Sequence, residues 1–154
     1  MEPTDFDILL IDDNPGDAKL IQLAFAQCPL AKLRVSVLAE SRDAINYLHH
    51  TGKFTDAPTP DIVLLDYHMP IDGGIALSEI KGNPDFQQIP VIVLTGSSNP
   101  RDVEDVYRRH ANCCFLKRSN VDDLLELSCD IVKLWLLKAM LPPKQKGRFT
   151  SPLN

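Results

Sequence analysis

The sequence lacks the features that mark membrane, secreted and nucleic-acid-binding proteins. No apolar run approaches the roughly 20 residues that a membrane-spanning helix needs. Residues 1–5 are acidic and do not lead into the apolar core of a signal peptide. The net charge is −5, the opposite of the basic excess that favours nonspecific binding to nucleic acids or anionic membranes. We therefore expect a cytoplasmic protein with no nucleic-acid or membrane partner.

Cysteine is scarce and shows no metal-binding pattern. The sequence has four cysteines, two of them adjacent, and none is spaced as in a C-x-x-C clip. We expect free thiols. His49 and His50 form another candidate pair, but they lie at the end of a predicted helix, where imidazole rings commonly cap carbonyl groups. Neither set predicts a metal site.

Five short segments predict β-strands. Four of them are apolar and typical of buried strands, namely residues 8–11, 62–65, 91–94 and 113–116. Residues 33–37 alternate between apolar and polar side chains, which favours a strand at the sheet edge. Helical patterns separate the strands, and the last helix is expected to end near Met140. This alternation predicts an α/β domain, a doubly wound five-stranded parallel sheet with helices on both faces. Asparagine N-caps predict the starts of three helices at Asn14, Asn99 and Asn120.

Four predicted strands end in residues suited to metal or phosphate chemistry. Asp12 and Asp13 follow the first strand, and Asp66, Thr95 and Lys117 follow the third, fourth and fifth. In a parallel sheet these ends share one edge, where three carboxylates repel one another unless a cation such as Mg²⁺ lies among them. Lysine and threonine can contact phosphoryl oxygens. An aspartate in such surroundings has the groups needed for nucleophilic attack on a phosphoryl group.

With their neighbours, the strand ends form a specific set of motifs: Ile11-Asp12-Asp13, Leu65-Asp66, Met69-Pro70, Gly73, Leu94-Thr95 and Leu116-Lys117. This set resembles the receiver domain of two-component response regulators, over residues 6–138. The resemblance implies a flavodoxin-like fold with strand order 2-1-3-4-5. It also implies that Asp66 accepts a phosphoryl group from a histidine kinase, while Thr95 and Lys117 contact the phosphoryl oxygens and relay the modification.

The same resemblance implies how Mg²⁺ is bound. Asp13 and Asp66 would bind the ion directly, the backbone carbonyl of His68 would supply a third ligand, and Asp12 would act largely through water. We expect a phosphoacceptor signalling protein rather than an enzyme, with only phosphotransfer and slow autodephosphorylation as chemistry.

Three positions depart from the receiver pattern, and one of them is His68, where a small amide or apolar residue is more usual. Arg118 follows the lysine in place of the usual proline, so this loop is expected to be either strained or rearranged to a trans peptide. Cys114 stands where many receivers carry the aromatic residue that moves inward on phosphorylation. The usual threonine-to-aromatic switch therefore lacks its aromatic partner.

More narrowly, three segments resemble the small single-domain regulators paired with phytochrome-type histidine kinases: residues 12–17, 52–61 and 83–85. We expect the receiver domain to span residues 1–142. Residues 143–154 are then a tail that is flexible or serves as a dimer arm. Because so short a tail leaves no room for an output domain, we expect the signal to leave through protein–protein contact in a phosphorelay.

The last predicted helix carries more apolar residues than one packed face needs. One stripe contains Leu124, Ser128, Ile131 and Trp135, and a second contains Leu125, Cys129, Val132 and Leu136. A helix apolar over so much of its circumference is buried on more than one side. This pattern predicts a homodimer through the helix, and the alternative is that loop residues of the same chain cover the second stripe.

Two other functions remain open from the sequence. A degenerate receiver would bind partners without phosphorylation. A Mg²⁺-dependent phosphohydrolase would form an aspartyl-phosphate and turn it over, but such enzymes look as if they need a second aspartate where this chain has His68.

Overall fold

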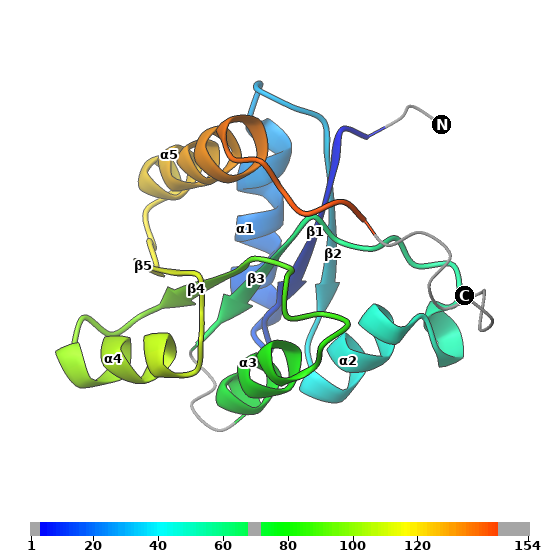
Figure 1. The fold of residues 1–154 in the computed structure, drawn as a ribbon. Helices are drawn as coiled ribbons and strands as arrows, with labels where there is room; N and C mark the ends of the chain where they lie inside the picture. Colours follow the sequence, from blue (N-terminus) through cyan, green and yellow to red (C-terminus); the bar gives the residue numbers. More distant parts are fainter. Residues whose placement is uncertain (1–3, 68–71, 145–154) are drawn as a thin grey trace.

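The computed structural model describes residues 4–67 and 72–144, so the predictions for His68 and for the tail from residue 145 lie outside the described part. Five strands form one parallel sheet in the order β2-β1-β3-β4-β5 (Figure 1). They are β1 (Phe6–Ile11), β2 (Leu33–Leu38), β3 (Ile62–Asp66), β4 (Val91–Thr95) and β5 (Cys113–Leu116). The predicted sheet and its strand order are confirmed, and β2 lies at an edge as its alternating pattern indicated.

Helices cover both faces of the sheet (Figure 1). One face carries α1 (Pro15–Gln27) and α5 (Val121–Ile131), and the other carries α2 (Ser41–His49), the short 3-10 turn η1 (Gly52–Phe54), α3 (Asp72–Gly82) and α4 (Pro100–Arg108). Successive strand residues point to opposite faces. Ile8 and Leu10 therefore join the core under α1 and α5, while Leu9 and Ile11 join the core under α2, α3 and α4. None of the helices among the described residues has the length and apolar character needed to span a membrane.

The predicted asparagine caps begin three of the helices. The Asn14 side chain accepts a hydrogen bond from the backbone N–H of Asp17 at 3.0 Å. Asn99 and Asn120 cap α4 and α5 in the same way. Each cap satisfies a backbone donor that the first turn of a helix leaves unpaired. The cap at Asn14 also fixes the turn from β1 into α1, which places Asp17 beside the carboxyl edge of the sheet.

The last helix differs from the prediction. Beyond α5 it continues as a π-helical segment, η2 (Val132–Lys138), and ends before Met140. A π-helical turn is wider than an α-helical turn and shifts the buried face of a helix. Val132 and Leu136 of the predicted second stripe are consequently buried in the core of their own chain. Leu134 and Leu137 of η2 remain exposed, and so does Met140, which follows the helix.

Candidate functional site

The carboxyl edge of the sheet brings the residues of four strand ends together. Asp66 ends β3 and pairs in register with Leu94, so it lies next to Thr95 at the end of β4. Lys117 follows β5, and its backbone N–H donates to the carbonyl of Thr95 at 2.7 Å. Asp12 follows β1, the neighbour of β3 on the other side. The strand order reverses at β1 and β3, the position where open α/β sheets bind ligands.

Asp66 is completely buried, and Lys117 supplies a balancing charge. Lys117 Nζ lies 3.0 Å from Asp66 Oδ2, within hydrogen-bond distance. A buried carboxylate without a cationic partner would be strongly unfavourable. The lysine side chain is only 14% exposed, so solvent screens this pair weakly.

Lys117 also contacts two further carboxylates. Its Nζ lies 2.8 Å from Asp17 Oδ2 and 3.7 Å from Asp12 Oδ2. Burial lowers the pKa of Lys117, but the hydrogen bonds to Asp17 and Asp66 and the nearby negative charges outweigh burial, and the pKa is raised. Asp17 was not among the predicted site residues. Its position in the first turn of α1 explained its charge, and nothing local indicated a contact with a lysine 100 residues away.

Asp12 is buried, and its two carboxylate oxygens differ in their surroundings. Its Oδ1 accepts the backbone N–H of Asn14 at 2.9 Å, while Oδ2 accepts no hydrogen bond from the described residues. Burial raises the pKa of Asp12 to about 6, and the neighbouring Asp66 adds to the increase, while the Asn14 N–H and Lys117 oppose it. A buried oxygen of this kind is the atom that a bound cation would satisfy.

Asp12, Asp13 and Asp66 form a candidate metal centre. Each offers one carboxylate oxygen, and the three oxygens lie within 4.8 Å of one another. Mg²⁺ is bound by such oxygen donors together with water. The cluster fits the ion because it already holds an unsatisfied oxygen, and because Asp13 is exposed and leaves the cluster open to solvent. The predicted third ligand, the carbonyl of His68, lies outside the described residues.

Thr95 holds the loop that leads from β4 into α4. Its side chain is nearly buried, and Oγ1 accepts the backbone N–H of Ser97 at 3.1 Å. Ser97 in turn donates its hydroxyl hydrogen to Asp102 Oδ2 at 2.6 Å, in the first turn of α4. A change at the Thr95 hydroxyl is thereby connected to the start of α4 through two hydrogen bonds.

A second polar network begins at Tyr67, directly after Asp66. The Tyr67 hydroxyl donates to Asp105 Oδ2 of α4 at 2.9 Å, and Arg109 Nε donates to the same oxygen at 3.0 Å. Arg109 also reaches α3 through the carbonyl of Gly74 at 3.3 Å. Burial and then the Asp105 carboxylate raise the pKa of Tyr67 to about 12. A Cβ at Gly74 would lie 3.1 Å from an Arg109 nitrogen, so the glycine permits this close approach.

The departures from the receiver pattern at positions 114 and 118 have clear structural outcomes. The described residues contain no cis peptide bond, so the Lys117–Arg118 peptide is trans, one of the two expected arrangements. The backbone N–H of Cys114 donates to the hydroxyl of Tyr107 of α4 at 3.2 Å. An aromatic side chain thus lies beside β5, but it comes from α4 rather than from position 114.

The cysteines and paired histidines lie apart from the site. All four cysteines fall within the described residues and are free, as expected. His50 caps α2 in the left-handed conformation with a φ of 57°, and a ring nitrogen lies 3.1 Å from Thr59 Oγ1. The ring of His49 packs against Phe86 at a centroid distance of 4.6 Å. Both histidines are therefore engaged in structural contacts at the end of α2.

Comparison with known proteins gives the family. The family model described as "Response regulator receiver domain" matches residues 8–128. Response regulator Rcp1 of Synechocystis sp. is 36% identical over 136 residues, which cover 88% of this chain and 92% of Rcp1.

Two solved structures extend the comparison. The phosphorylated cyanobacterial phytochrome response regulator RcpA has 36% sequence identity and a TM-score of 0.81, over 90% of this chain and 99% of RcpA. The Mn²⁺-bound form of Rcp1 has 35% identity and a TM-score of 0.78, over the same shares of the two chains. The family match at residues 8–128 includes β2 to β5, all but the first two residues of β1, and the edge at which Asp12, Asp66 and Lys117 meet. This chain therefore belongs to the response regulator receiver domain family.

Proposed function

We propose that the protein is a single-domain response regulator that accepts a phosphoryl group from a histidine kinase on Asp66. The observation that carries the proposal is the fully buried Asp66 carboxylate at the sheet edge, 3.0 Å from Lys117 Nζ. An Asp66 oxygen would attack the phosphorus atom, and the bond between phosphorus and the histidine nitrogen of the kinase would break. Lys117 lies where it can neutralise the charge on the transferred group.

The acidic cluster would hold the metal that this family uses. Receiver domains bind Mg²⁺, and a structural relative is the Mn²⁺-bound form of Rcp1. We propose direct ligation by Asp13, Asp66 and the carbonyl of His68, with Asp12 acting largely through water. The bound ion would offset negative charge between the carboxylates and the incoming phosphoryl oxygens. Thr95 would donate its hydroxyl hydrogen to one of those oxygens, in place of its present 3.5 Å contact with the carbonyl of Ser97.

The cognate kinase is proposed to be of the phytochrome type. RcpA is described as a phytochrome response regulator, and this chain is 36% identical to it over nearly its whole length. Phosphotransfer from a purified phytochrome-type kinase should therefore be faster than from an unrelated histidine kinase. We place the protein in the cytoplasm, which is supported by its four free thiols.

A homodimer through the end of the last helix is also proposed. Leu134 and Leu137 are 54% and 48% exposed, and Met140 is 99% exposed. These side chains would supply the apolar centre of an interface, and tail residues after 144 would serve as a dimer arm. Sedimentation at micromolar concentration should give a dimer, and Leu134→Glu should give a monomer. A wild-type monomer at that concentration would rule out the dimer.

One experiment tests the phosphoacceptor role. The protein is incubated with acetyl phosphate and Mg²⁺, and its mass is followed over time with Asp66→Asn as the control. We expect a slowly decaying adduct of one phosphoryl group in the wild type and none in the variant. Rapid turnover without accumulation would instead identify a phosphohydrolase. No adduct from acetyl phosphate or from a kinase would identify a degenerate receiver that acts only by binding.

A further inference from the structure

A cleft lies at the amino edge of the sheet, at the opposite end of the strands from Asp66. Its apolar lining comes from α2 and from the loops before β3 and β4, and consists of Leu48, Pro60, Phe86, Ile89 and Pro90. The polar residues Thr59, Asp61, Asp85 and Gln88 of the same loops complete that lining. Residues 142–144 form the remaining side of the cleft. Figure 1 shows the segment after α5 crossing the end of the sheet at which β1 and β3 begin.

Two carboxylates are held together at this edge. Asp61 Oδ2 accepts the backbone N–H of Asp7 at 2.7 Å, and the Asp61 N–H donates to the Asp7 carbonyl at 2.8 Å. The two side chains are only 12% and 13% exposed. Arg34 of β2 offsets one charge, with Nε 2.6 Å from Asp7 Oδ1. A second cation is needed because two adjacent, mostly buried carboxylates repel each other.

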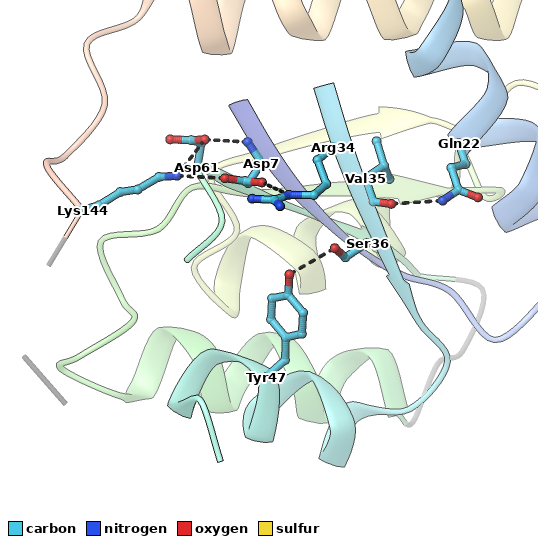
Figure 2. Close-up of polar contacts among 8 residues, drawn as sticks. All are labelled: Asp7, Gln22, Arg34, Val35, Ser36, Tyr47, Asp61 and Lys144. Atoms are coloured by element: carbon cyan, nitrogen blue, oxygen red, sulfur yellow. Dashed lines mark hydrogen bonds and ion pairs between the residues drawn. The ribbon is translucent and has the colours of Figure 1, made fainter. Parts of the chain in front are cut away.

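Lys144 provides that cation. Its Nζ lies 3.2 Å from Asp7 Oδ2 and 3.3 Å from Asp61 Oδ2, so it bridges the starts of β1 and β3 (Figure 2). Among the described residues, the cluster then contains two carboxylates and two cations. The second carboxylate charge is therefore balanced by Lys144, a residue from the far end of the chain.

The segment that delivers Lys144 is well suited to docking. Leu141 packs against the apolar core under α1 and α5, so the segment is attached at its first residue as well as at its last. Pro142 and Pro143 have fixed φ angles, which restrict the chain between these two attachments and reduce the entropy lost on docking. The apolar lining suits the two prolines, and the Asp7 and Asp61 carboxylates suit the lysine that follows them.

We propose that this cleft is an intramolecular docking site for residues 141–144, and that Lys144 latches the C-terminal segment to the receiver core. The segment would then be part of the folded domain, and the predicted domain boundary at residue 142 would lie too early. The contact is independent of phosphorylation chemistry, because Asp7 and Asp61 lie at the opposite edge of the sheet from Asp66.

The first test releases the latch while keeping the fold. Asp61→Asn retains an oxygen that can accept the Asp7 N–H but removes one negative charge. We expect trypsin to cleave after Lys144 about fivefold faster in this variant, since the lost ion pair is partly exposed. Cleavage after Lys138, measured by mass spectrometry in the same digest, should not change. Asp56→Asn, the same change in an exposed loop residue, serves as the matched control. Equal rates in both variants would overturn the proposal.

A double-mutant cycle tests the pairing itself. Lys144→Met and Asp61→Asn are made singly and together in the full chain, and unfolding equilibrium constants are measured in urea. We expect a coupling of about fivefold between the two sites. Lys133→Met, in an exposed lysine of η2, should show none. Coupling below about twofold would refute the latch.

The same digestion identifies the chain that fills the cleft. Intramolecular docking predicts a cleavage rate after Lys144 that does not change when the protein is diluted tenfold. If protection increased with protein concentration, the occupant would be the tail of a second copy and intramolecular docking would be wrong. Asp61→Asn should still accept a phosphoryl group from acetyl phosphate, so failure of the latch and failure of the phosphoacceptor proposal are distinguishable.

Discussion

Replacing Asp12 with asparagine is expected to stabilise the protein when divalent metal ions are absent. Asp12 is 2% exposed, and one of its oxygens accepts no hydrogen bond from the described residues. Asparagine keeps an oxygen for the backbone N–H of Asn14 and removes one of the negative charges that face Asp66. Without metal, the site of the wild type is therefore less favourable than the site of the variant.

The size of the effect follows from the pKa of Asp12, which rises from 3.8 to about 6 on folding. Between these two pH values the folded protein binds a proton that the unfolded chain releases. The free energy of unfolding therefore decreases as pH rises from about 4 to about 6, and then becomes constant. The raised pKa corresponds to a cost of about 3 kcal/mol at pH 8 and about half of that at pH 5.

Urea unfolding followed by circular dichroism, in buffer with EDTA at pH 5 and pH 8, measures this difference. Asp12→Asn should exceed the wild type by about 3 kcal/mol at pH 8 and by clearly less at pH 5. Asp13→Asn is the control, because Asp13 is exposed and its charge is screened by water. If Asp12→Asn were no more stable than the wild type at pH 8, or if its advantage did not grow with pH, the argument from burial would fail.

Three further predictions concern the metal, the lysine and the tyrosine. Mg²⁺ at a concentration a hundredfold above its Kd should raise the free energy of unfolding by about 2.7 kcal/mol. Calorimetric titration gives the Kd, and an unchanged melting temperature would contradict metal binding to the folded site. Lys117→Met should cost about 3 kcal/mol in urea unfolding without Mg²⁺, because it removes the cation 3.0 Å from the buried Asp66 carboxylate. A neutral effect would show that this ion pair does not stabilise the fold. Tyr67→Phe should lower the free energy of unfolding by about 1 kcal/mol, because the hydrogen bond to Asp105 is lost. Labelling of Asp66 by acetyl phosphate should continue in this variant, and loss of labelling would assign Tyr67 a role in the reaction.

The parts of the fold that the sequence predicts are those determined by neighbouring residues. The apolar runs locate the strands because burial on both faces requires them. Asparagine caps locate helix starts because the cap and the backbone N–H that donates to it are only two or three residues apart. The site could be anticipated as well, since parallel strands place Asp12, Asp66 and Lys117 at one edge whatever the details of packing.

The missed contacts join residues that are distant in sequence. Asp17 meets Lys117 across 100 residues, and Lys144 meets Asp7 across 137. No local pattern encodes such pairs, because each depends on the final orientation of a helix or of the C-terminal segment. The π-helical turn of η2 was missed for a similar reason. Helical periodicity alone placed Val132 and Leu136 on a second apolar stripe, whereas both pack in the core of their own chain.

The hydrogen bond between Tyr107 and the backbone of Cys114 has a consequence for solubility. β5 lies at the end of the sheet, so its outer backbone groups would be open to pairing with a strand from another molecule. The Tyr107 hydroxyl engages one of these amides, and the strand is only four residues long. A strand from another molecule that approached β5 would find a short edge on which the N–H of Cys114 is already hydrogen-bonded. The tyrosine of α4 thus protects the sheet against edge-to-edge aggregation.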